Sequence, residues 1–545
     1  MGAIDQNHYD VIVIGGGVTG AGTARDCSVR GLKTLLVERF DFTAGATGRN
    51  HGLLHSGARY AVTDQESATE CIKENMTLRK IARHCVEETD GLFITLPEDD
   101  LNYQRTFVDA CTAAGIRAEI ISPEEARRLE PAVNPELTGA VRVPDASIDP
   151  FRLTAANIID ARRHGATVRT YQEVTGLIID NGCVRGVELR DNHTGETRQV
   201  HCRLVINAAG IWGQAVAKMA GVKINMFPAK GTLLVFGHRV NGMVINRCRR
   251  PSNADILVPD DTVSVIGTTS DRVPFETLDN LGITPREVDL LIKEGEKLAP
   301  ELASTRILRA YAGVRPLVAN DDDPSGRTIS RGIVLLDHEK RDGLKGLITI
   351  TGGKMMTYRL MAEKATDLAC QKLGVDKKCQ TATTPLPGSE QRHESASTSH
   401  DANQYSHYAL IGRHGTMARD IPAGTPEDDA LVCECENVTA GEVKFAAERL
   451  HVHNLINLRR RTRIGMGTCQ GQLCAARGAN VLCRVAHMQA QKAERDLAAF
   501  VGERWKGMQP VAWGDTLNEA QLTSMVYEDL CGLDQLTGGE KEIAR

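Results

Sequence analysis

The 545-residue sequence has few aromatic residues and no excess of positive charge. Aromatic side chains make up only 4% of it, too few for the stacking platforms that bind single-stranded nucleic acid. The 65 basic and 70 acidic side chains give a formal net charge of −5, whereas a nucleic-acid-binding protein normally carries a basic surface stripe. We therefore expect no nucleic acid among its partners.

The sequence also lacks long apolar runs. No stretch approaches the roughly 20 apolar residues that span a bilayer, and the polar first ten residues lack the basic and apolar regions of a signal peptide. We therefore expect a cytoplasmic chain. In that reducing compartment the 15 cysteines are not expected to form structural disulfides, so their spacing must identify any that bind a metal.

The rest of the composition, 41% hydrophobic and 25% charged, is ordinary for a globular protein. The chain is long enough for several domains. Residues 388–406 are dense in Ser, His, Asn, Gln and Glu and nearly free of aliphatic residues, which indicates a linker. We expect an oxidoreductase domain with a discontinuous substrate-binding part, a flexible linker, a cysteine-bearing domain and a helical tail, over residues 1–387, 388–429, 430–484 and 485–545.

A glycine-rich turn near the N-terminus indicates a dinucleotide site. The run from Gly15 to Gly20 fits G-x-G-x-x-G, between a β-branched strand at 10–14 and an expected helix at 21–30. The first glycine permits a tight turn, the second lets the backbone approach a pyrophosphate, and the third lets the helix pack on the strand. Glu38 ends the next strand, eighteen residues after Gly20, where an acid can accept a ribose hydroxyl hydrogen bond.

The cofactor is expected to be FAD rather than NAD. No second glycine motif follows a strand downstream, whereas flavoenzymes that react with a nicotinamide commonly carry two such folds. The run Asn207-Ala208-Ala209-Gly210 directly follows a strand-like segment at 204–206 and resembles the second glycine contact of flavoproteins.

Three further segments, 45–60, 309–317 and 351–359, crowd cations around glycines. At these residues the chain resembles the FAD-dependent glycerol-3-phosphate dehydrogenases, and its cysteine-bearing extension is similar to that of the anaerobic bacterial members. The resemblance implies an α/β fold, in which a Rossmann-like FAD domain is interleaved with a mixed-sheet substrate domain. It also implies oxidation of sn-glycerol 3-phosphate to dihydroxyacetone phosphate. Electrons would pass to partner subunits, including a membrane-anchoring iron–sulfur subunit, and then to quinone, which places the chain peripherally on the inner face of the cell membrane.

The resemblance also implies which residues form the site. Arginine suits bidentate contact with phosphate, and histidine titrates closest to neutral pH, so His55 is the expected acceptor of the substrate hydroxyl proton. Lys354, if desolvated, is the alternative. The expected substrate-site residues are His55, Arg59, Tyr60, Arg315, Arg331, Lys354 and Thr357. The expected cofactor-binding residues are Gly15, Gly17, Val18, Thr19, Gly20, Glu38, Arg39, Thr47, Gly210 and Gly353.

Two cysteine pairs near the C-terminus are spaced as ligands. Cys433 and Cys435 precede Cys469 and Cys474 by a gap of thirty-three residues, and four thiolates can hold one iron–sulfur or zinc centre. The segment resembles the [2Fe–2S] domain of bacterioferritin-associated ferredoxins, although its second pair is spaced more widely than that family's C-x-x-C. We predict a [2Fe–2S] cluster, with zinc or free thiols as alternatives. Arginines 459–461 and 463 either face solvent or stabilise the reduced cluster.

Two other functions remain open at this stage. One is an amine or 2-hydroxy-acid dehydrogenase with the same FAD domain, although an amino-acid substrate would need no cation cluster drawn from three segments. The other is a non-enzymatic redox or metal-binding scaffold, which purified protein without bound flavin would favour.

Overall fold

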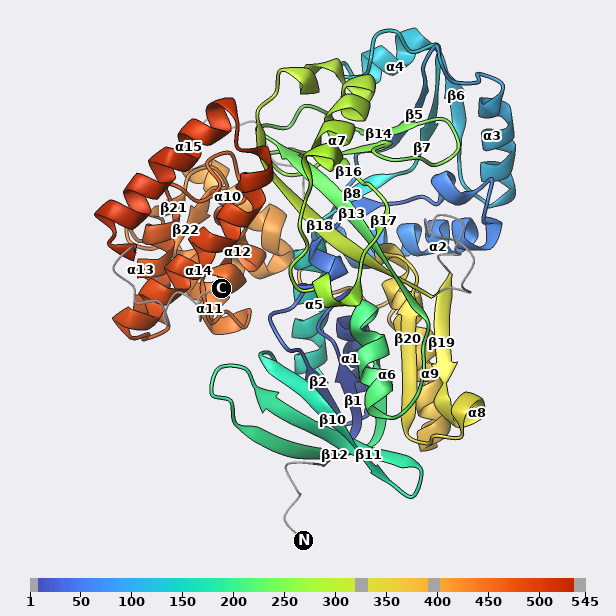
Figure 1. The fold of residues 1–545 in the computed structure, drawn as a ribbon, viewed down its shortest axis with the longest axis vertical. Helices are drawn as coiled ribbons and strands as arrows, with labels where there is room; N and C mark the ends of the chain where they lie inside the picture. The colour runs from blue at the N-terminus through green and yellow to red at the C-terminus, as the bar shows by residue number, and fades with distance from the viewer. Residues whose placement is uncertain (1–7, 319–331, 391–401, 534–545) are drawn as a thin grey trace.

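The protein is described by a computed structural model over residues 8–318, 332–390 and 402–533 (Figure 1). It opens with the expected βαβ unit, in which β1 (His8–Ile14) and β2 (Thr34–Val37) flank α1 (Val18–Val29) and pair in parallel. Residues 11–14 of β1 and all of β2 are buried, which explains why the apolar residues there form continuous runs instead of alternating with polar ones.

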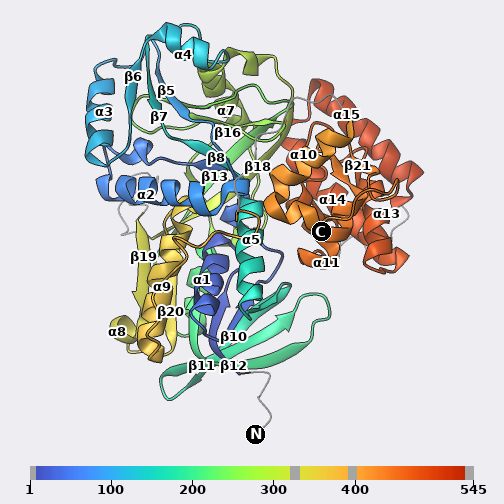
Figure 2. The same cartoon turned by 180° about the vertical axis from the view of Figure 1, so that it is seen from behind.

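These strands belong to the sheet of the nucleotide-binding domain. β12 (Thr197–Asn207) lies parallel to β1 on its other side, and α1 packs against α5 (Pro150–Arg163) and α9 (Tyr358–Leu373) over one face (Figure 2). Around them the sheet is completed by β9 (Thr167–Arg169), β10 (Gln172–Asp180), β11 (Cys183–Asp191), β19 (Ile333–Asp337) and β20 (Leu347–Gly352).

A second, mixed sheet stands above the first in Figure 1. Its longest strands are the antiparallel pair β13 (Met226–Phe236) and β18 (Ile307–Val318) at one end of the strand order, and α7 (Pro285–Leu298) packs against β13. The sheet also contains β5 (Gly91–Thr95), β6 (Glu119–Ile121), β7 (Gly139–Val143), β14 (Val244–Arg247), β15 (Ile256–Pro259), β16 (Ser264–Gly267) and β17 (Asp271–Arg272). Because the chain passes repeatedly between the two sheets, the expected interleaved α/β architecture is confirmed.

Smaller elements complete these two parts. A short three-stranded sheet lies between them, and α6 follows β12. The smaller elements are the strands of this short sheet and five helices: β3 (Leu53–Leu54), β4 (Val86–Glu87), β8 (Ala146–Ile148), α2 (Gln65–Ile81), α3 (Tyr103–Ala113), α4 (Pro123–Leu129), α6 (Gly213–Met219) and α8 (His338–Asp342). None of the helices in the described ranges is both long and apolar enough to cross a membrane.

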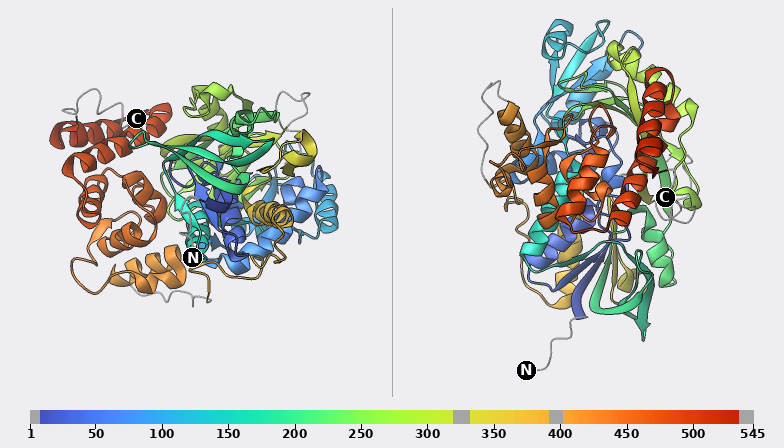
Figure 3. Two further views of the ribbon diagram at one scale, coloured as in Figure 1. Left: turned by 90° about the horizontal axis from the view of Figure 1, so that it is seen from below. Right: turned by 90° about the vertical axis from the view of Figure 1, so that its left-hand side faces the viewer.

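The C-terminal unit is mainly helical and lies to one side of both sheets (Figure 3). It has its own apolar core, which includes Val443, Leu458 and Phe500. Its elements are α10 (Ala402–His414), β21 (Leu431–Cys433), β22 (Val438–Thr439), α11 (Ala440–Arg449), α12 (Leu455–Thr462), α13 (Ala475–Val485), α14 (Ala490–Met508) and α15 (Gly514–Ser524).

The structure corrects the expected linker over 388–429. Helix α10 lies inside that range, and its last two residues are buried against α11, where the Glu442 carboxylate accepts hydrogen bonds from Arg413 (2.6 and 2.8 Å) and contacts His414 Nε2 (2.8 Å). The polar composition favours a linker, but the end of this segment is ordered because the buried Glu442 carboxylate pairs with Arg413 and His414. Residues 391–401 lie outside the described ranges.

Buried ion pairs attach the C-terminal unit to the rest of the protein. Arg461 and Arg460 of α12 bind the Asp41 carboxylate at 2.6 and 3.0 Å, and Arg463 binds Asp260 at 3.0 Å. Burial opposes ionisation of Asp41, but Arg461 and Arg460 outweigh burial and lower its pKa. Asp41 belongs to the nucleotide-binding domain and Asp260 follows β15, so both parts hold the same helix.

We predict that His451 makes this attachment sensitive to acid. Burial lowers its pKa from 6.5 to about 4, so it is neutral when folded, 3.0 Å from Thr170 Oγ1. The unfolded chain takes up the proton at higher pH, so stability from this histidine is lost as pH falls from about 6.5 toward 4. The loss between pH 7 and 5 should be about 1–2 kcal/mol.

The test compares thermal unfolding of wild type and His451→Asn from pH 8 to 5. Asparagine tolerates the left-handed backbone of this position (φ 59°) and does not titrate. The stability difference between the two proteins should shrink toward pH 5. A difference independent of pH would rule out His451 as the titrating group.

Candidate functional site

A cavity of about 1080 Å³ lies between the nucleotide-binding domain and the second sheet. Its walls come from the β1–α1 turn, the loop over residues 44–64, the middle of β18 and the turn after β20. The three cation-bearing segments singled out in the sequence therefore meet around one space, together with the glycine motif. The volume slightly exceeds the usual range of about 300–1,000 Å³ for small-molecule sites, as room for a cofactor and a substrate together requires.

The glycine motif has the geometry that close backbone approach requires. Gly15 has a φ of +111°, which disfavours any residue with a side chain. A Cβ on Gly20 would lie 1.9 Å from the Gly15 carbonyl oxygen, so only glycine lets α1 begin this close to β1. Gly17, Val18 and Thr19 line the cavity at the start of α1, where the positive end of the helix dipole favours phosphate.

Three further expected cofactor residues line the same end of the cavity. The half-buried Glu38 carboxylate accepts hydrogen bonds from the Gly16 and Phe40 amides (2.6 and 2.9 Å), and its removal from bulk water raises its pKa. Thr47 Oγ1 accepts one from the Val18 amide (3.1 Å). The Arg39 guanidinium stacks 4.6 Å from the Trp212 ring centroid and pairs with Asp279. These two contacts hold Arg39 against the wall of the cavity.

The remaining expected cofactor residues, Gly210 and Gly353, lie at two other turns of the cavity wall. Both have positive φ, +57° and +63°. A Cβ on Gly353 would meet Met361 Sδ at 2.5 Å, so the turn after β20 can pack against α9 only with glycine there.

The substrate end of the cavity brings together several expected cations and a hydroxyl. Lys354 Nζ lies 4.6 Å from the Tyr60 ring centroid, and His55 stands edge-on to the same ring with centroids 5.5 Å apart. Arg315, on β18, donates to Thr269 O (3.0 Å) and to the Thr268 hydroxyl. Arg59 also lines this wall and forms an ion pair with buried Asp255 (3.1 Å). Charged and polar side chains thus converge where an anionic polyol could bind.

Two expected substrate residues are not brought to this wall. Thr357 is buried, and its hydroxyl bonds the amide and the carbonyl of Lys354 (2.9 and 3.0 Å), so it shapes the turn instead of lining the cavity. Arg331 lies outside the described residues.

Sequence reasoning missed several lining residues, among them Trp212, Arg250 and Thr268. Trp212 directly follows the Asn207–Gly210 turn and Arg250 ends a cluster of three arginines within four residues, so both carried a local signal. Thr268 carried none, because only the pairing of β16 with β13 brings it beside Arg315.

The two cysteine pairs also meet. Cys433 ends β21, Cys474 precedes α13, and the thiols of Cys433 and Cys474, of Cys435 and Cys469, and of Cys469 and Cys474 hydrogen-bond to one another. Hydrogen bonds from Cys435 and Cys474 lower the pKa of Cys469. The Gly471 and Leu473 amides point at its sulfur and the Gly465 and Glu436 amides at Cys433, donors that suit the sulfurs of an anionic cluster.

The four sulfurs therefore fit a cluster held by thiolates. In the part of the chain that the structure describes, no group of three or more His, Cys, Asp or Glu side chains is arranged to hold a single metal ion. Of the two alternatives left open for the neighbouring arginine run, a solvent-facing surface does not describe three of its members. Arg460, Arg461 and Arg463 are instead the interdomain ion-pair residues described above.

Comparisons with known proteins agree with both sites. Residues 10–359 match the family described as FAD dependent oxidoreductase, and residues 431–484 match the BFD-like [2Fe-2S] binding domain. The chain is 60% identical to the A subunit of the anaerobic glycerol-3-phosphate dehydrogenase of Escherichia coli (strain K12), covering 97% of this chain and 98% of that one. The chain belongs to the family of anaerobic glycerol-3-phosphate dehydrogenase A subunits.

More distant relatives extend this likeness. The A1 subunit of the Haloferax volcanii enzyme is 41% identical over 96% of this chain and 91% of its own. The FAD complex of a Bacillus halodurans glycerol-3-phosphate dehydrogenase has the same fold, with a TM-score of 0.68 at 21% identity over 94% of this chain and 97% of that one. The chain is thus an FAD-dependent oxidoreductase with a [2Fe–2S] domain. Both expected cofactors are confirmed, and zinc is set aside.

We predict that Gly17→Val yields soluble protein without FAD. A Cβ at Gly17 already lies 3.0 Å from Thr47 Oγ1, and branched methyl groups would occupy the space that a pyrophosphate needs. Flavin absorbance per protein should fall severalfold. Gly502→Val is the control, since a Cβ there meets no described atom within 4 Å, and it should retain flavin. Normal flavin content in Gly17→Val would disprove the placement of the pyrophosphate.

Proposed function

We propose that the chain oxidises sn-glycerol 3-phosphate to dihydroxyacetone phosphate and passes the electrons through FAD and the [2Fe–2S] cluster to partner subunits. The observation that carries this is the 60% identity over 97% of the chain to a protein of that name, together with a cavity whose substrate end holds Arg315 and Lys354. Electron transfer follows from having both cofactors in one chain.

The residues at the substrate end suit this reaction. Arg315 would bind the phosphate, since its guanidinium fork matches phosphate oxygens and is held by Thr268 and Thr269. Lys354 and Arg59 would add positive charge to the same wall. Bound FAD supplies the acceptor for the two electrons that leave substrate C2 with its hydrogen.

A basic side chain must also take the proton of the C2 hydroxyl. We assign this to His55, which is 7% exposed and lines the cavity beside Tyr60, because an imidazole can accept a proton near neutral pH. Lys354, on the same ring, is the alternative base. Tyr60 packs against both side chains and so fixes their positions.

We further propose that the electrons leave through partner subunits, one of them a membrane-anchoring iron–sulfur protein, and reach quinone. The chain would then lie peripherally on the inner face of the cell membrane. The relatives are named as the A or A1 component of their enzymes, which supports a complex. Leu473, one residue before Cys474, is 59% exposed, so the cysteine loop would offer this apolar side chain to a partner.

The substrate assignment is tested at Arg315. Arg315→Ala should remove a charge-assisted contact of about 1.5–3 kcal/mol, which lowers kcat/KM for glycerol 3-phosphate about 10- to 100-fold. Arg315→Lys should restore only part of it, because a point charge lacks the planar fork. Flavin content serves as the control for folding. An alanine variant with full kcat/KM would exclude Arg315 as the phosphate ligand.

The electron path is tested at Cys469. Cys469→Ser should lose most of its iron, because a serine oxygen is a harder and more basic ligand than thiolate. Substrate should still bleach the flavin, and a small dye should still accept its electrons, while quinone-linked turnover in the complex fails. Cys531→Ser, at an exposed cysteine, should behave as wild type. Undiminished quinone-linked turnover in a Cys469→Ser protein without iron would place the cluster off the path.

A further inference from the structure

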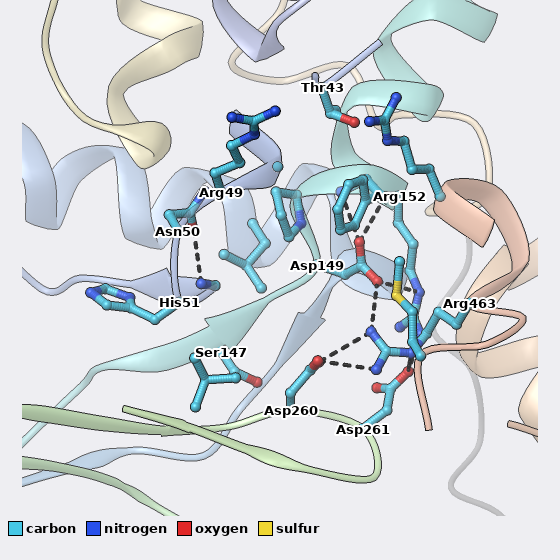
Figure 4. A pocket seen from close by; sticks show the side chains of 18 of the residues that line it. Thr43, Arg49, Asn50, His51, Ser147, Asp149, Arg152, Asp260, Asp261 and Arg463 are labelled. Carbon is cyan, nitrogen blue, oxygen red and sulfur yellow. Dashed lines mark hydrogen bonds and ion pairs between the residues drawn. The ribbon is translucent and has the colours of Figure 1, made fainter. Parts of the chain in front are cut away.

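A second cavity, of about 1030 Å³, lies where the C-terminal unit meets the other two parts (Figure 4). Its walls are the loop over residues 43–52, the segment 259–265 beside β15, residues 309–312 of β18, and α12 with the cysteine loop that follows it. Arg49, Asn50 and His51 line this cavity and the first one as well. The second cavity therefore lies between the flavin cavity and the loop that carries Cys469.

The lining is rich in positive charge. Ten lysines and arginines face seven aspartates and glutamates. Much of this charge is paired: Figure 4 shows Arg152 and Arg463 pointing at a cluster of carboxylates, where Arg463 lies 3.0 Å from both Asp260 and Asp261. These pairs neutralise one side of the cavity.

Three arginines on the cavity walls differ from these paired residues. Among the described residues, Arg49, Arg309 and Arg459 have no salt bridge and no side-chain hydrogen bond. The Nε atoms of Arg309 and Arg459 are buried and have no hydrogen-bond partner there, although the Arg309 guanidinium lies 5.8 Å from the Tyr311 ring centroid. A buried guanidinium N–H without an acceptor is costly.

The electrostatic surroundings show that these three charges are poorly compensated. Burial lowers the pKa of each, and Arg309 lowers that of Arg49 and of Arg459 further. Within the described ranges, Glu503 is the carboxylate that attracts all three. An anion between these guanidinium groups would relieve their mutual repulsion and supply the missing acceptors.

We propose that Arg49, Arg309 and Arg459 bind the phosphate group of a phosphorylated organic molecule in this cavity. A phosphate dianion balances an excess of two positive charges and matches the guanidinium fork. The cavity is far larger than inorganic phosphate, and Phe151, Val235 and Ile456 contribute apolar wall, which suits the organic part of an ester. This site is separate from the substrate phosphate contact at Arg315, which lines the first cavity and not the second.

The experiment is calorimetric titration of the full-length, flavin-loaded protein in phosphate-free buffer, with phenyl phosphate and with inorganic phosphate as probes. All variants are made in an Arg315→Ala parent, in which binding of the probes at the proposed substrate site is weakened. Whether Arg315 binds the substrate is tested separately, through kcat/KM. Phenyl phosphate should bind the parent saturably and more tightly than inorganic phosphate. Adding Arg309→Gln or Arg459→Gln should raise its Kd about 10- to 100-fold.

Two controls separate ligand binding from a structural role. Arg449→Gln, at an exposed residue of α11, should leave Kd unchanged. Without probe, Arg459→Gln should unfold at the same or higher temperature than its parent, because it removes an uncompensated charge, whereas a structural arginine would lower that temperature. Absence of saturable binding to the parent, or a Kd unaffected by both glutamine variants, would overturn the site. Equal affinity for the two probes would overturn its assignment to an organic ester.

Discussion

Ion pairs buried between the C-terminal unit and the two sheets hold the protein's two redox sites in one arrangement. Asp41, from the loop after β2, is shared by Arg460 and Arg461, while Arg463 joins Glu436 of its own unit to Asp260 beside the second sheet. Such pairs add little net stability, but removing one partner leaves a buried charge at a cost of about 3–5 kcal/mol. Their main effect is therefore to fix where the cysteine loop lies relative to the flavin cavity.

The C-terminal helices extend this constraint to the cysteines themselves. Arg504 of α14 donates to the Cys469 carbonyl (2.6 Å), and the Tyr527 hydroxyl, in the turn after α15, donates to the Gly471 and Gln472 carbonyls (3.1 and 2.6 Å). Phe500 packs where Gly465 and Gly471 leave room. A segment expected as a tail thus supports the loop between Cys469 and Cys474 from outside the cysteine-bearing domain.

The sequence pattern predicts correctly those elements and turns that depend only on residues close together in the chain. The expected strands over 10–14 and 204–206 lie within β1 and β12, because a continuous apolar run marks a strand that is buried on both faces. The glycine turn and the acid after β2 were equally clear. What failed depended on contacts distant in sequence. Nothing local shows that Arg413 meets Glu442, so a polar stretch was assigned to a linker. Thr357 is the exception, because the hydrogen bonds that turn its hydroxyl inward are to Lys354, three residues before it.

The arginine run at 459–463 shows the same limit most sharply. In sequence its members look alike, yet α12 sends Arg460 and Arg461 to Asp41 and leaves Arg459 on a cavity without an acceptor among the described residues. Helical periodicity places neighbours about 100° apart, so adjacent arginines must face different surroundings. Whether each is paired was decided by where Asp41 lies in the fold, more than four hundred residues away in the chain. Only the structure therefore shows which charged residues at a domain junction are paired. An arginine that has no acceptor there is a candidate for binding an anion.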